Sequence, residues 1–261
     1  NDGALVIDQP YTINGVCYYF DEEGKRAKAP SGWQTFNGKT YYGMPDGTYR
    51  TGWLYFGSTV YYCGNDGAIV YGKQKISSKW YYFDENGKRK SNGWINDGDN
   101  TYYALSDGEL RVGWLYFGST VYYCGSDASI IKGKDYAVNG IMYTFDENGV
   151  MKKEGGWGSY NGRRYYKNPA TGFPYTGWVR IGSDQYYADA NGYMVSGWKL
   201  ISGTYYYFYP STNKMARSTT IDGYMVDANG ARINTGLARM LQKAWGYSSS
   251  TQYLLLVDRS T

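Results

Sequence analysis

The chain repeats a short pattern in which aromatic and apolar residues alternate with polar ones between glycine-containing turns. A unit opens with Gly-Trp, passes through a polar turn such as Phe36-Asn37-Gly38-Lys39, and continues with Tyr-Tyr. A second turn, such as Asn86-Gly87, closes the unit. Because Asn-Gly and Asp-Gly tolerate positive φ, they are the strongest turn signals between short strands. Each unit is therefore predicted to form a β-hairpin.

The units recur with a period near 20 residues. The segment Gly52–Gly64 returns unchanged as Gly113–Gly125, and about eleven units lie between Tyr11 and Asn234. Gly-Trp pairs mark seven of them, at Trp33, Trp53, Trp94, Trp114, Trp157, Trp178 and Trp198. A hairpin of this size cannot bury its own faces and must pack on its neighbours. We therefore predict an all-β solenoid of about eleven stacked β-hairpin repeats of ~20 residues over residues 1–234.

Residues 235–261 depart from the repeat. Leu237, Met240, Leu241 and Ala244 follow helical spacing, which predicts a short helix. The apolar run 252–258 predicts a strand. We interpret this end as a helical linker followed by the first strand of a truncated domain; the alternative is a strand that caps the last hairpin.

Composition removes several function classes. The 261 residues include 33 Tyr and 36 Gly but no His, which excludes a Ser-His-Asp triad and a His-ligated zinc ion. The net charge of +4 is small and scattered, so no nucleic-acid partner is expected. No apolar run approaches the length of a membrane span. The first ten residues lack signal-peptide features, so such a peptide is expected to be absent or removed.

No catalytic, metal or cofactor site is expected in the repeats. The three cysteines, Cys17, Cys63 and Cys124, are predicted to be free, partly buried thiols, because equivalent positions of separate repeats lie too far apart for a disulfide. Asp84-Glu85-Asn86-Gly87 and its counterparts lack the distal Glu of a calcium loop and are interpreted as turns.

The Tyr-Tyr pairs point toward binding. Adjacent strand residues face opposite sides, so one Tyr of each pair can join the core while the other faces outward. With the Gly-Trp rings, they are predicted to line aromatic clefts between hairpins. Such clefts suit sugar rings by stacking and quaternary ammonium groups by cation–π attraction. The alternative is that the rings serve packing alone.

At these residues the chain resembles the cell-wall-binding repeat family of choline-binding and glucan-binding type, over about residues 11–234. The family unit runs from Gly-Trp through a glycine turn to an aromatic-Tyr-Tyr triplet. The resemblance implies a hairpin solenoid that attaches surface proteins to wall polymers without catalysis of its own.

The resemblance also implies candidate ligand-binding residues. Choline sites of the family combine an opening Trp, the first aromatic of a triplet and an aromatic of the next hairpin, often closed by a Met. The first triplet position is mostly not aromatic here, as at Thr40 and Val60, so a wall glycan is as open an interpretation as choline. The candidates are Trp198 with Tyr205, closed by Tyr224 or Met215; Trp178 and Tyr187 of the preceding unit; and the opening residues Trp33, Trp53, Trp94 and Trp114.

We therefore predict a secreted, non-catalytic module of a Gram-positive cell surface whose partner is a wall polymer: a glycan, a teichoic acid or choline. One alternative is the targeting portion of a peptidoglycan-remodelling enzyme, since the C-terminal run resembles the opening of L,D-transpeptidase domains. Another is a structural stalk or adhesin that binds a protein. The sequence leaves the polymer, the number of working sites and the oligomeric state open.

Overall fold

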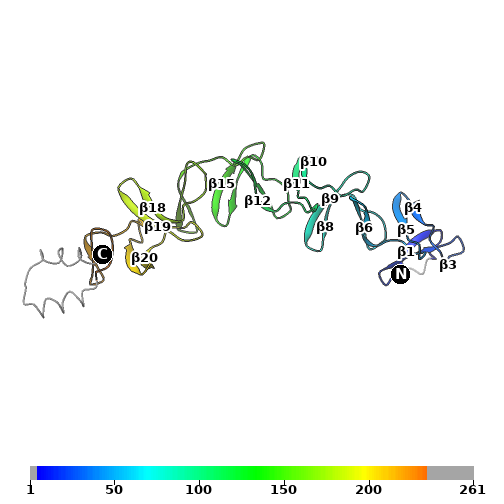
Figure 1. Cartoon of the computed structure of the whole chain (residues 1–261), viewed down its shortest axis with the longest axis horizontal. Helices are drawn as coiled ribbons and strands as arrows, with labels where there is room; N and C mark the ends of the chain where they lie inside the picture. The colour runs from blue at the N-terminus through cyan, green and yellow to red at the C-terminus, as the bar shows by residue number, and fades with distance from the viewer. Residues whose placement is uncertain (1–4, 234–261) are drawn as a thin grey trace, which may run out of the picture. The chain divides into compact units, whose positions relative to one another are not determined.

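The computed structural model describes residues 5–233, which form β-hairpins joined by turns and linkers, with no helix in this range (Figure 1). The predicted C-terminal helix and strand lie outside the described residues. The prediction of an all-β chain of about eleven successive hairpins is confirmed.

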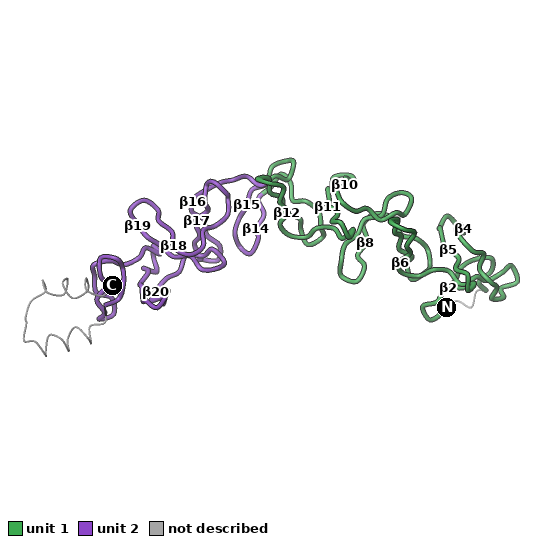
Figure 2. Tube along the Cα trace, viewed as in Figure 1, with its two compact units in different colours: residues 1–134, 145–150 green, residues 135–144, 151–261 purple. Residues whose placement is uncertain are grey.

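Two compact units divide the chain (Figure 2): residues 1–134 with 145–150, and residues 135–144 with 151–261. The strands encountered first are β1 (Gln9–Ile13), β2 (Val16–Phe20), β3 (Arg26–Ala27), β4 (Gly32–Phe36), β5 (Lys39–Gly43), β6 (Gly52–Phe56), β7 (Thr59–Cys63), β8 (Gly72–Ile76), β9 (Lys79–Phe83), β10 (Gly93–Asp97), β11 (Asn100–Ala104), β12 (Gly113–Phe117) and β13 (Thr120–Cys124). They are followed by β14 (Lys134–Val138), β15 (Ile141–Phe145), β16 (Gly156–Tyr160), β17 (Arg163–Lys167), β18 (Gly177–Ile181), β19 (Asp184–Ala188), β20 (Gly197–Ile201), β21 (Thr204–Phe208), β22 (Thr219–Ile221) and β23 (Tyr224–Val226).

Each hairpin pairs only with itself, apart from the first, which adds β3 as a third strand. In most repeats two five-residue strands meet across a two-residue turn. Asn37 (φ 51°) and Gly38 (φ 76°) form that turn between β4 and β5. Two consecutive positive φ angles match the right-handed twist of the strands, which explains why Asn-Gly recurs in these turns.

The Asp-X-Asn-Gly segments lie elsewhere, in the turns that leave each second strand. The Oδ1 atom of Asp84 accepts hydrogen bonds from the backbone N–H groups of Asn86 (3.0 Å) and Lys88 (2.9 Å), and Gly87 has φ of 74°. Their interpretation as turns is confirmed.

Backbone hydrogen bonds from each linker join consecutive hairpins. After β7, the N–H of Ile69 donates to the carbonyl of Thr40 in the preceding hairpin (2.8 Å), while the N–H of Val70 donates to Tyr62 of its own (3.0 Å). The pair Ile130 and Ile131 repeats both bonds on Thr101 and Tyr123. This arrangement fixes the spacing of neighbouring hairpins within a unit.

The core consists of small clusters repeated along each unit. Leu54, Cys63 and Ile69 form one of them, against which Tyr42 and Tyr61 pack. Leu115, Cys124 and Ile130 form its counterpart. All three cysteines are free and have no exposed surface, so their burial is complete rather than partial. Burial raises the pKa of the Cys63 and Cys124 thiols to about 12, since it disfavours the thiolate.

Candidate functional site

The strand register brings each Gly-Trp ring against two tyrosines. Trp33 lies opposite Tyr42 within its hairpin, with ring centroids 5.0 Å apart, and 4.9 Å from Tyr61 of the next hairpin. Both contacts are edge-to-face, the arrangement that aromatic quadrupoles favour. Trp94 repeats this geometry with Tyr103 (5.2 Å) and Tyr122 (5.0 Å). Tyr102 is buried, as predicted for one Tyr of the pair, whereas Tyr103 does not face outward but is half-buried against Trp94 and the core cluster of Leu115.

A cavity of about 250 Å³ opens beside Trp33. Three successive hairpins and their linkers contribute its lining: Trp33, Thr40, Tyr61, Ile69, Tyr71, Glu85 and Asn86. We call this the Trp33 cavity. The Trp33 side chain is 42% exposed although three rings surround it, and Phe56 packs on it at 5.9 Å.

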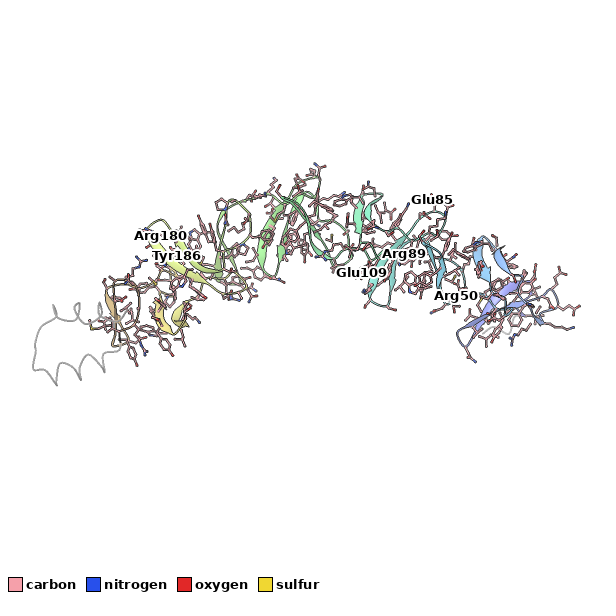
Figure 3. All side chains as sticks on the ribbon, in the orientation of Figure 1. Arg50, Glu85, Arg89, Glu109, Arg180 and Tyr186 are labelled. Atoms are coloured by element: carbon pink, nitrogen blue, oxygen red, sulfur yellow. The ribbon has the colours of Figure 1, made fainter. Side chains whose placement is uncertain are left out.

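The local structure explains how these side chains converge. The bond from the Ile69 N–H to Thr40 places the linker across the cavity, and two residues later the Tyr71 hydroxyl donates to the Thr40 Oγ1 atom at 3.5 Å. The turn after β9 supplies Glu85, which is marked in Figure 3. Aromatic faces beside a carboxylate attract a cation, and the open mouth admits a group as large as a quaternary ammonium.

The equivalent cluster around Trp94 carries a positive charge. It comprises Trp94, Thr101, Phe117, Tyr122 and Lys132, and we call it the Trp94 cluster. Lys132 occupies the position of Tyr71, and its Nζ atom donates to the Thr101 Oγ1 atom at 2.6 Å. The Trp94 ring is 45% exposed, so the rings are retained while the charge is reversed.

The structure groups Trp178 with Tyr187 and Met215. The rings of Trp178 and Tyr187 are 5.2 Å apart, and Tyr206 of the next hairpin lies 4.8 Å from Trp178. Met215 is buried with Ile201 and Phe208, and Tyr187 and Tyr206 pack on this cluster. Its N–H donates to the Gln185 carbonyl, which is the bond that Ile69 makes beside Trp33. Met215 is therefore placed beside Trp178 in the same way as Ile69 is placed beside Trp33.

Around Trp198 the predicted residues Tyr205 and Tyr224 come together without Met215. Trp198 lies 5.9 Å from Tyr224, and its indole N–H donates to Asp222 (3.0 Å). The guanidinium of Arg232 lies over Tyr224 (4.4 Å), Tyr205 (4.5 Å) and Trp198 (5.9 Å). We call these three rings the Trp198 cluster. A cation of the chain itself already occupies the position that a ligand cation would take.

Two further predicted residues lie in tighter packing. Trp53 contacts Tyr62 (5.0 Å) and Tyr81 (4.9 Å), and the Arg89 guanidinium lies 5.7 Å from its ring. Trp114 contacts Tyr123 of its hairpin (4.9 Å) and Phe145 (6.3 Å).

The sequence reasoning missed several residues that the structure brings into these sites. Tyr71 and Glu85 of the Trp33 cavity were not candidates, and neither were the internal cations. The hairpin of β8 and β9 has no Gly-Trp pair, and Lys73 takes the position of the tryptophan there. Its ammonium lies 4.9 Å from the rings of both Trp80 and Tyr102. Comparing position 71 with position 132 across the 61-residue repeat would have revealed the first of these differences.

Two searches of the described part of the chain were negative. Residues 5–233 contain no group of three or more cysteine and acidic side chains arranged to hold a metal ion. Within the same range, no helix has the length and apolar character needed to cross a membrane.

Known protein families match several of these repeats. The choline-binding repeat model matches residues 175–219, and the putative cell wall binding repeat model matches residues 51–69, 74–88 and 92–110. These segments therefore carry repeats of the choline-binding and cell-wall-binding type. A comparison with curated proteins gave no match.

Similar solved structures come from Streptococcus pneumoniae. Choline binding protein F is 25% identical over 87% of this chain and 98% of that chain, with a TM-score of 0.35. The choline binding domain of Spr1274 is 36% identical over 31% of this chain and 95% of that domain, with a TM-score of 0.29. The modular autolysin LytC is 22% identical over 82% of this chain and 50% of that chain, with a TM-score of 0.40.

Proposed function

We propose that this chain attaches a secreted protein to a Gram-positive cell wall by binding quaternary ammonium groups, chiefly choline, carried on a wall polymer. The Trp33 cavity is the observation that carries this proposal. It combines the faces of Trp33, Tyr61 and Tyr71 with the carboxylate of Glu85 in one open volume of about 250 Å³. No side-chain cation of the described residues lies over the Trp33 ring, so the cation–π position is available to a ligand.

The charge of the cavity favours choline over an uncharged glycan. A sugar ring would stack on one aromatic face and use hydroxyl partners, whereas a trimethylammonium group has no hydrogen-bond donor and gains from several faces at once. Glu85 adds Coulomb attraction for a cation and nothing comparable for a neutral sugar. A polymer that carries many choline groups gains further from avidity, because a second contact becomes intramolecular.

The proposed role of the repeats is binding without catalysis. The acidic side chains at the turns serve the fold: Asp84, Asp146 and Asp189 accept backbone hydrogen bonds, and Arg163 also pairs with Asp189 at 2.6 Å. Glycoside hydrolysis needs two carboxyl groups across a shared cleft, whereas the Trp33 cavity is lined by one. Purified chain incubated with walls is expected to release no soluble glycan or peptide.

Sedimentation with purified cell walls tests the proposed function. Wild-type chain should sediment with walls that carry choline and should be released by free choline. Trp33→Ala should reduce sedimentation, whereas Trp94→Ala is the matched control, since it removes an equally exposed ring beside Lys132. Binding that persists on choline-free walls and resists free choline would contradict the proposal and favour a glycan. Failure to sediment with any wall would favour a stalk that binds a protein.

A further inference from the structure

One position in the linker after most hairpins donates its backbone N–H to a carbonyl of the preceding hairpin, and the type of residue at this position differs between repeats. In the compact unit that contains residues 151–261, this N–H donates to the carbonyl of the first triplet residue of the preceding hairpin in three consecutive repeats. The distance is 2.8 Å each time: Met194 to Arg164, Met215 to Gln185 and Arg232 to Tyr205. The shared bond fixes where the side chain of this linker position begins, so the three side chains start from equivalent places. Two are uncharged and the third is a guanidinium.

At the last of these repeats the guanidinium lies on the aromatic cluster. Arg232 is 4.4 Å from Tyr224, 4.5 Å from Tyr205 and 5.9 Å from Trp198. Its guanidinium forms no hydrogen bond or ion pair with another residue of the described range, so these three rings are its contacts there. Asp222 holds the indole of Trp198 by a 3.0 Å hydrogen bond. The cluster therefore has the rings of a cation site, and Arg232 supplies the cation.

An arginine at the same linker position also lies beside Trp53. Arg89 makes the equivalent backbone bond to Val60 (2.8 Å), and its guanidinium lies 5.7 Å from the Trp53 ring. The Nε atom of Arg89 is buried without a hydrogen-bond partner in the described residues. Where the same position holds Ile69, beside Trp33, the cavity is open.

We propose that an arginine at this linker position closes its aromatic cluster to an external cation, and that the Trp198 cluster is a quaternary ammonium site kept closed by Arg232. This inference rests on the proposed function for its ligand. A tethered guanidinium must leave the rings before a ligand enters, so the apparent affinity of the cluster falls by the fraction of time that it is open. Removing the guanidinium creates a working site without building any new aromatic contact.

The experiment measures choline binding by calorimetry in a Trp33→Ala background, which silences the open cavity. Adding Arg232→Met gives this position the residue found at Met215, and choline affinity should rise about 10-fold. Adding Trp198→Ala to that variant should abolish the gain. Arg26→Met is the matched control, because it removes one positive charge that lies over Tyr18 (3.9 Å), away from any Gly-Trp cluster; it should produce no gain.

Several outcomes would overturn this inference. Arg232→Gln provides a second variant in case the methionine disturbs packing, and circular dichroism checks that each variant is folded. Folded Arg232→Met and Arg232→Gln proteins that show no gain contradict the proposal, as does a gain that survives Trp198→Ala. Failure of the proposed function has a different signature, since wild type and Trp33→Ala would then bind choline equally poorly whatever residue stands at position 232.

Discussion

The Trp33 cavity and the Trp94 cluster are two copies of one structure with opposite charge. Their central hairpins, Gly52–Gly64 and Gly113–Gly125, are identical in sequence, and the ring distances agree within 0.3 Å. The difference lies in the residues that flank these hairpins. Tyr71 reaches Thr40 in the first copy, whereas Lys132 reaches Thr101 in the second.

The acidic turns differ as well. Glu85 lines the Trp33 cavity, and nothing lies within 4 Å of the Cβ position of the nearby Gly72. In the second copy the carboxylate of Glu147 lies over Gly133, and its Oε2 atom is 2.7 Å from the place that a Cβ atom of Gly133 would take. The comparison teaches that the repeated rings form a common scaffold, while a few linker and turn positions decide what each copy can bind.

The largest expected effect separates the two tryptophans. Trp33→Ala removes the largest aromatic ring of the open cavity and should weaken choline binding by about 10-fold, equivalent to about 1.4 kcal/mol. Trp94→Ala should change affinity by less than about twofold, because Lys132 already disfavours a cation there. Calorimetry with choline measures both. Equal losses in the two variants would show that the copies are functionally equivalent.

Exchanging the flanking residues should exchange the behaviour of the two copies. Tyr71→Lys brings an ammonium into the Trp33 cavity and should lower choline affinity by about fivefold through like-charge repulsion and loss of a ring. In a Trp33→Ala background, Lys132→Tyr should restore measurable binding at the Trp94 cluster. Fluorescence titration follows both changes, and a Lys132→Tyr protein that gains nothing would mean that the turn holding Glu147 matters more.

A smaller effect is expected from the carboxylate of the open cavity. Glu85→Gln keeps the shape of the cavity and removes its charge, so choline affinity should fall about two- to threefold, as expected for an exposed ion pair. Because salt screens such contacts, the difference between Glu85→Gln and wild type should shrink in 1 M NaCl. Calorimetry at two salt concentrations tests this, with Glu147→Gln as the control. A salt-independent loss would indicate a role in packing.

The smallest contrast is expected between Cys63 and Cys124, which occupy equivalent clusters with no exposed surface. Burial raises the pKa of both thiols from 9.0 to about 12. The folded state favours the neutral thiols, and this contribution to the free energy of unfolding is complete below pH 9. It is lost as the pH rises from 9 toward 12, because the thiols of the unfolded chain ionise first. Chemical denaturation across this range should show a falling free energy of unfolding, and a Cys63→Ala, Cys124→Ala protein should show a shallower fall.

Thiol labelling provides the matching kinetic test. Because both thiols are buried, each should react with a disulfide reagent only after local or global unfolding, and the two rates should agree within about twofold. Rapid reaction of one thiol in folded protein would show that its copy of the repeat opens independently.

Much of the fold follows from local sequence. Asn37-Gly38 sets a two-residue hairpin turn because both residues tolerate positive φ, and the distance of five residues from Gly-Trp to that turn fixes the register. The pairing of Trp178 with Tyr187 could be predicted, because strand alternation places both rings on one face of their hairpin. The Asp-X-Asn-Gly turns and their place after each second strand were also predictable, because the Asn-Gly step follows the residues of that strand, as Asn86-Gly87 follows Tyr81-Tyr82.

The chain's sequence by itself determined the hairpins, their number and the supply of aromatic rings, because these depend on residues a few positions apart. Only the tertiary structure decided which rings are open. Tyr71, Glu85, Lys132 and Arg232 act on rings 8 to 52 residues away in the sequence, and their approach depends on backbone bonds between neighbouring hairpins. The physical reason is that a cation–π or Coulomb contact depends on distance in space, and stacking the hairpins sets that distance.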